Sequence, residues 1–92
     1  MTGQEKEGGK FILILKATED KRLRYITARK LALLWPDISF AKWKAKVDEG
    51  ETIILMRSDH IADLDRYKNG LDEVGALSEI VEQKSIGGAV VF

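Results

Sequence analysis

The chain has 92 residues, no cysteine, and a formal net charge of zero from 15 basic and 15 acidic residues. This length predicts one domain with a modest core, and the absence of cysteine excludes disulfides, thiolate metal sites and cysteine nucleophiles. The polar N-terminus has no apolar signal region and no apolar run approaches the roughly 20 residues of a membrane span, so we expect a cytoplasmic protein that does not enter the membrane.

Residues 1–10 are polar and glycine-rich, which predicts a flexible N-terminal arm. The apolar run at 11–15 is typical of a central β-strand. A helix is predicted over residues 21–34, with Thr18 or Asp20 as its N-cap. Its buried stripe is expected at three- and four-residue spacing, at Leu23, Ile26 or Thr27, Leu31 and Leu34.

Trp35 and Pro36 end this helix, because proline disfavours helical geometry in the residue before it. A second helix is predicted at about 38–48, with Phe40, Trp43 and Val47 on one face. Gly50 suits the left-handed position that follows a helix end. Residues 52–56 predict a second strand.

Ser58 is the expected start of a third helix that runs to Gly75, with apolar positions Ile61, Leu64, Leu71 and Val74. The Asn69-Gly70 pair interrupts an otherwise continuous helical period, because glycine costs about 1 kcal/mol relative to alanine there. Residues 76–83 predict an edge strand.

Residues 85–92 form a glycine-hinged apolar tail with three interpretations. In the first interpretation the tail adds to a sheet edge or packs within the molecule. In the second it mediates self-association through an exposed edge, and in the third it inserts as a terminal ligand into a peptide-binding domain. The oligomeric state stays open.

The predicted order is strand, helix, helix, strand, helix, strand. We therefore predict an α+β fold, with a three-stranded sheet covered on one face by three helices in a single domain at 11–84.

This order resembles the superfold shared by the ClpS protease adaptors and the C-terminal domain of the bacterial ribosomal stalk protein. The resemblance extends over about residues 11–83. It is carried by Ile14–Ala17 before the helix at Lys21, by Val47, Gly50 and Ile53-Ile54, by Asp59–Asp63, and by Asp72–Ala76 before the last strand.

The adaptor family recognises an N-terminal amine through an Asn-Asp-Asp run after the first strand and a histidine at the end of the second helix. The matching positions here hold Ala17-Thr18-Glu19 and Val47, and only Glu19 keeps a carboxylate. An ammonium ion needs several acceptors held together, and alanine and valine side chains supply none.

The stalk family binds translation GTPases through basic and small residues on its first two helices. Lys21, Arg29 and Lys44 match basic positions of that surface. The glycine-bearing helix junction of the family is replaced here by residues 35–39. The resemblance thus implies a docking surface of the stalk type without the stalk protein's own junction.

Positive charge is concentrated in one segment. Residues 21–46 contain eight basic residues and one acid, Asp37, whereas residues 47–92 contain four basic and ten acidic residues. Such asymmetry informs about partners rather than about the fold. The positive segment has two interpretations. It is either a helix face whose charge is neutralised by acids from the third helix or the N-terminal arm, or a surface that binds a partner.

We predict a non-catalytic protein–protein interaction module that docks an acidic protein partner through a basic surface on its first two helices. Nucleic-acid binding by the same patch is the alternative, although the sequence pI of about 6.6 is low for that class. The predicted contact residues share positive charge, with one aromatic anchor: Lys21, Arg22, Arg29, Lys42, Lys44, Lys46 and Trp35.

Other candidate residues have simpler interpretations. Trp43 is expected in the core. His60, the only histidine, has no companions that would form a catalytic or metal-binding set, so we expect neither an enzyme nor a cofactor or metal.

Overall fold

We analysed a computed structural model, which describes residues 10–82 and 90–91. The predicted N-terminal arm, apart from Lys10, lies outside the described residues, as do residues 83–89 and 92 of the C-terminal part. The elements in chain order are β1 (Phe11–Leu15), α1 (Lys21–Leu34), α2 (Phe40–Asp48), β2 (Ile53–Ser58), α3 (Ile61–Asp72), β3 (Ser78–Glu82) and β4 (Val90–Val91).

The sheet has the strand order β3-β1-β2-β4, with β1 in the interior as predicted. Strand β1 pairs antiparallel with both β2 and β3, and Phe11 lies opposite Ser58 on one side and Glu82 on the other. A bulge interrupts the β1–β2 register between Leu13 and Ile14. The short strand β4 pairs with β2 in parallel, which corresponds to the sheet-edge interpretation of the tail.

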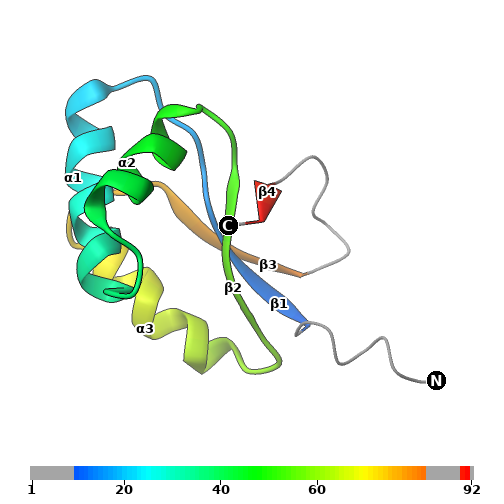
Figure 1. Ribbon diagram of the computed structural model, residues 1–92. Helices are drawn as coiled ribbons and strands as arrows, with labels where there is room; N and C mark the ends of the chain where they lie inside the picture. The colour runs from blue at the N-terminus through cyan, green and yellow to red at the C-terminus, as the bar shows by residue number, and fades with distance from the viewer. Residues whose placement is uncertain (1–9, 83–89, 92) are drawn as a thin grey trace.

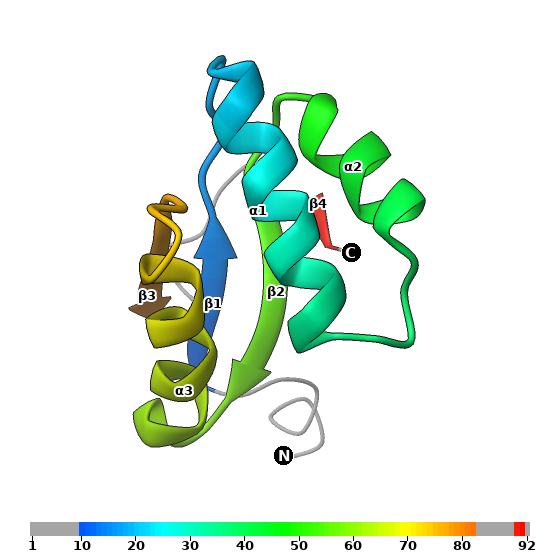
Figure 2. The ribbon, with the colours of Figure 1, turned by 90° about the vertical axis from the view of Figure 1, so that its left-hand side faces the viewer.

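All three helices cover one face of the sheet, with α1 between α2 and α3 (Figures 1 and 2). The main core lies between the two layers, where Leu13 and Ile53 from the sheet meet Leu31, Trp43 and Leu64 from the helices. Because successive strand residues point to opposite faces, the other residues of β1 and β2 form a second cluster. That cluster contains Ile12, Ile14 and Ile54, with Val81 packed against it.

The α+β fold, its element order and its three-stranded antiparallel β2-β1-β3 sheet are confirmed. Strand β1 and helix α1 begin and end where they were predicted. Asp20 is the N-cap of α1 and accepts hydrogen bonds from the backbone N–H groups of Arg22 and Leu23. Ser39 caps α2 by accepting from Lys42 N, so this helix begins at Phe40 rather than at residue 38.

The predicted start of α3 was wrong. Ser58 is the last residue of β2, because it still pairs with Phe11 of β1, and the helix begins at Ile61 after His60. The Ser58 hydroxyl nevertheless marks the turn: it accepts from His60 N at 3.0 Å and donates to the Asp63 carboxylate at 2.8 Å. Ile61, one of the apolar positions named for this helix, is 45% exposed.

Gly70, which interrupts the apolar period of α3, lies where α3 approaches α1. A Cβ at this position would lie 3.3 Å from Cδ2 of Leu34 and 3.4 Å from Cε of Lys30. Glycine therefore serves close helix packing here, even though it lowers the helix propensity of α3.

Replacing Gly70 with valine should destabilise the protein by about 1–3 kcal/mol, the usual cost of forcing extra methyl groups into a packed contact. Urea unfolding monitored by circular dichroism measures this loss. Asn69→Val, at the exposed neighbouring position of the same helix, is the matched control. Equal losses in the two variants would mean that the α1–α3 contact has no special need for glycine.

Candidate functional site

Four of the eight basic residues of the 21–46 segment contact a carboxylate of a residue that the structure describes. Two of these ion pairs join elements far apart in the sequence, and two follow helical spacing. The pairs are Arg24–Asp48 at 3.9 Å, Lys30–Glu73 at 3.2 Å, Lys44–Asp48 at 2.7 Å and Lys46–Glu49 at 3.4 Å.

The other four basic residues, Lys21, Arg22, Arg29 and Lys42, are exposed. Within residues 10–82 and 90–91, none of them lies within 4.0 Å of a carboxylate. The basic surface is therefore smaller than the segment's charge suggests, and most of its unpaired charge belongs to α1.

Helix α1 presents a ridge to solvent, which we define as Tyr25, Arg29 and Leu33. These residues are one turn apart and therefore share one side of the helix, with Arg22 two turns before Arg29 on the same side. Leu33 is 74% exposed and Tyr25 46%. Leu31, which is fully buried, lies about 200° around the helix from Leu33.

The Arg29 side chain is held by Tyr25. Its Nη1 donates to the tyrosine hydroxyl at 3.3 Å, and the guanidinium carbon lies 5.9 Å from the ring centroid. A cation over an aromatic ring is attracted by the negative face of the ring. The guanidinium is therefore oriented along the ridge while it remains exposed to solvent.

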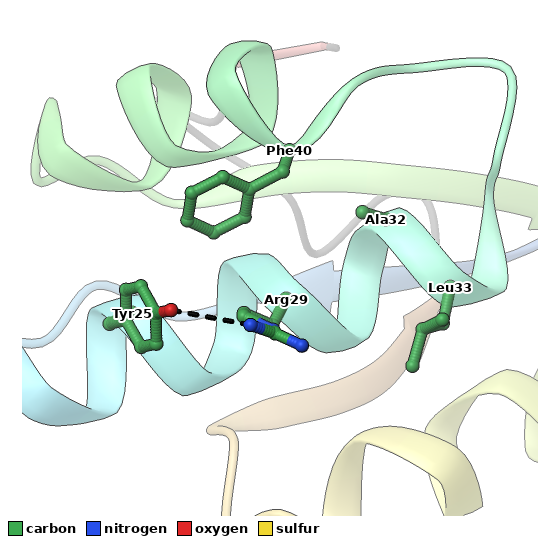
Figure 3. A pocket seen from close by; sticks show the side chains of 5 residues that line it. All are labelled: Tyr25, Arg29, Ala32, Leu33 and Phe40. Carbon is green, nitrogen blue, oxygen red and sulfur yellow. Dashed lines mark hydrogen bonds between the residues drawn. The ribbon is translucent and has the colours of Figure 1, made fainter.

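Two hollows flank the ridge. The first, of about 380 Å³, lies between α1 and α2, where Phe40 reaches toward α1 beside Ala32 (Figure 3). The rings of Phe40 and Tyr25 meet edge to face at 5.5 Å. We call this hollow the α1–α2 groove; its lining is Tyr25, Arg29, Ala32, Leu33 and Phe40.

The second hollow, of about 270 Å³, lies on the other side of the ridge, where Val74 follows the end of α3. We call it the α1–α3 groove; its lining is Tyr25, Ile26, Arg29, Lys30, Leu33 and Val74. Among the described residues, Arg29 and Lys30 are the only charged ones that line the two grooves, and Lys30 is paired with Glu73. No carboxylate of these residues is part of either lining.

The lysines of α2 do not form one surface. Lys44 is one turn after Phe40 and so lies on the side of α2 that carries the groove residue. Lys42 and Lys46 lie about 200° and 240° around the helix from Phe40. The structure therefore brings Arg22 and Arg29 together on α1, but places Lys42 and Lys46 on a different side of the helical layer.

Trp35 is half-buried and packed among aromatic rings rather than standing free. Its ring stacks on Tyr67 of α3, with centroids 4.7 Å apart and an angle of 19° between the planes. It also lies 6.0 Å from the ring of Trp43. Trp43 is 2% exposed, which confirms its assignment to the core.

A third hollow, of about 320 Å³, is formed by Ala17, Thr18, Glu19, Arg24 and Gly50. This is where the adaptor resemblance would position a client amine. Here Arg24 Nε donates to the Thr18 carbonyl at 2.6 Å, and Val47 is buried in the core. A guanidinium beside the hollow repels an ammonium ion, so its chemistry differs from that of an amine-binding pocket.

His60 is exposed at the N-cap position of α3, and its side chain makes no capping hydrogen bond. In the part of the chain that the structure describes, no cluster of three histidine or acidic side chains is arranged to hold a metal ion. No helix among the described residues is both long and apolar enough to span a membrane.

Sequence reasoning missed Tyr25 and Leu33 as exposed residues, and it missed Phe40, which is partly buried, as part of a groove lining. Leu33 lies in the apolar run that ends α1, where composition alone suggests burial. The available signal was the four-residue spacing of Tyr25, Arg29 and Leu33, which runs on the side opposite Leu31.

Comparisons with protein-family models, with curated proteins and with solved structures found no match to this chain. The site must therefore be interpreted from its own geometry.

Proposed function

We propose that the protein is a cytoplasmic, non-catalytic interaction module that docks an acidic protein partner on the exposed face of α1 and the adjoining start of α2. One observation carries the proposal: the guanidiniums of Arg22 and Arg29, which no carboxylate of the described residues contacts, share a helix side with the exposed apolar side chains of Tyr25 and Leu33. Exposed apolar groups joined to oriented charge are typical of protein-binding surfaces.

The contact set that we propose differs from the one predicted from sequence. Lys21, Arg22 and Arg29 supply charge that no described carboxylate neutralises, whereas Lys42 lies on a different side of the helical layer and is left out of the set. Lys44 and Lys46 contribute less, because Asp48 and Glu49 already pair with them. The apolar contribution comes from Tyr25, Leu33 and Phe40, since Trp35 packs on Tyr67.

The fold order also leads us to propose a distant relationship with the ClpS and ribosomal stalk superfold. The sheet with β1 in its interior and three helices on one face supports this relationship. Of the two activities in that superfold, docking on the first two helices fits the chain better than amine recognition, because Arg24 lies beside the hollow at Ala17–Glu19.

Reversing two charges tests the proposed surface. Arg22→Glu together with Arg29→Glu should abolish capture of the partner and remove most of the salt dependence of its association rate, because charge across an interface acts mainly on encounter. Both side chains are exposed, so the free energy of unfolding should change by no more than about 0.5 kcal/mol. Affinity capture from native extract identifies the partner, and stopped-flow mixing at several salt concentrations measures its association.

Lys10→Glu together with Arg66→Glu is the matched control, because it changes the net charge equally on exposed residues outside α1 and α2. Capture that survives reversal at Arg22 and Arg29 but fails in the control would refute the surface. Binding of duplex DNA or RNA at low salt, lost steeply as salt rises, would favour the nucleic-acid alternative instead.

A further inference from the structure

The α1 ridge has the form of one half of a helix–helix contact. Its three side chains repeat every four residues, and such rows are the ridges that pack into the grooves of a neighbouring helix. A hollow lies on each side of the row, and Leu33, the most exposed large apolar residue described, stands at its end. In Figure 3 the Leu33 side chain points away from α2, and those of Phe40 and Ala32 lie on the α2 side.

The position of the grooves indicates which secondary structure a partner segment would have when it binds in them. Both grooves lie in the helical layer, where the backbone groups of α1 and α2 are bonded within their own helices. An extended peptide would find no sheet edge there with which to pair its own N–H and C=O groups. A helix satisfies its backbone internally and presents only side chains, so it keeps its backbone hydrogen bonds on entering these grooves.

The charge of the grooves bears on the composition of the occupant. Arg29 lines both grooves, Arg22 extends the positive charge along the same side of α1, and no carboxylate from the part of the chain that the structure describes lines either groove. We propose that the α1 ridge receives an amphipathic acidic α-helix of a partner protein. Its apolar side chains occupy the grooves on either side of Leu33, and its carboxylates meet Arg29 and Arg22.

This inference rests on the proposed function and adds to it the form of the partner. The partner helix crosses α1 at an angle near −50°, the commonest packing angle for rows of this spacing. Carboxylates flank its apolar stripe, because Arg29 lies between Tyr25 and Leu33 on the ridge.

The test uses a designed helical peptide of about 18 residues, long enough to be helical in water when alanine-rich. It carries leucine at i, i+4 and i+7, glutamate on both flanks of that stripe, and alanine elsewhere. A second peptide has the same composition with the leucines distributed around the helix. Titration calorimetry against the full chain should show binding of the first peptide and none of the second.

Leu33→Ser should weaken binding of the amphipathic peptide about ten-fold, the effect expected when one leucine loses its buried contact. Leu77→Ser is the matched control, because Leu77 is 44% exposed and is not among the residues that line either groove. The affinity of the Leu77→Ser variant for the amphipathic peptide should equal that of the unsubstituted chain. Equal weakening by the two substitutions would overturn the assignment of the peptide to the ridge.

Other outcomes separate this inference from the function on which it rests. If both peptides bind equally and Arg29→Glu abolishes both, the basic surface stands and the helical partner is refuted. If Leu33→Ser weakens binding and charge reversal at Arg22 and Arg29 does not, the acidic character of the partner is refuted. If the chain self-associates and Leu33→Ser abolishes that association, a second copy occupies the ridge and the inference fails.

Discussion

Replacing Trp43 with alanine is expected to lower the free energy of unfolding by about 3–5 kcal/mol, the cost of emptying a large buried aromatic site. Trp43 is a residue of α2 and is 2% exposed. It packs in the main core with Trp35 and the buried leucines. Small domains are stable by only about 5–15 kcal/mol in total, so this single change should remove a large share of the stability.

Urea unfolding monitored by far-ultraviolet circular dichroism measures the loss at Trp43 without depending on tryptophan fluorescence. Trp43→Phe should cost less than Trp43→Ala, because it keeps most of the apolar volume. Leu33→Ala serves as the control on the neighbouring helix: Leu33 is 74% exposed, so its truncation should change stability by no more than about 0.5 kcal/mol. A comparable loss in the two alanine variants would contradict the core that we describe.

The second large effect is expected on the face of the sheet that the described helices do not cover. Ile12 is 1% exposed, as deeply buried as its neighbour Leu13, which points into the main core. We therefore expect Ile12→Ala to cost about 2–5 kcal/mol, in the range of buried aliphatic truncations.

Leu13→Ala provides the comparison for Ile12→Ala, because the two residues are adjacent in β1 and face opposite sides of the sheet. Thermal and urea unfolding of the two variants should give losses of similar size. A change below about 1 kcal/mol at Ile12, beside a large loss at Leu13, would show that the second cluster contributes little as a core.

The parts of the fold that were predictable depend on local patterns. The apolar run at β1 and the three- and four-residue period of α1 each define an element without help from the rest of the chain, and Asp20 supplies a local cap. The end of β2 was not predictable in this way. Arg57 and Ser58 remain in the strand because β1 pairs with them, which is a contact between distant segments.

For the candidate site, too, features that depend on local sequence were predictable, and features that depend on contacts between distant segments were not. The segregated positive charge was visible in the sequence. The helical spacings of Lys44 with Asp48 and of Lys46 with Glu49 are also present there, but they were not used to predict these ion pairs. The partnership of Lys30 with Glu73 was not visible, because it depends on how α1 packs against the end of α3. Gly70 illustrates the same limit, since its close approach to α1 appears only when both helices are in place.

The position of β1 in the sheet also affects when this strand can pair while the protein is being synthesised. Its two antiparallel neighbours are β2 and β3. Phe11 can therefore pair only after Ser58, and then Glu82, have been synthesised. The α1–α2 hairpin needs only a short connection and closes early, because loop closure is fast for near neighbours. Strand β1 therefore stays without its first neighbour until Ser58 has been synthesised, and without its second until Glu82 has followed.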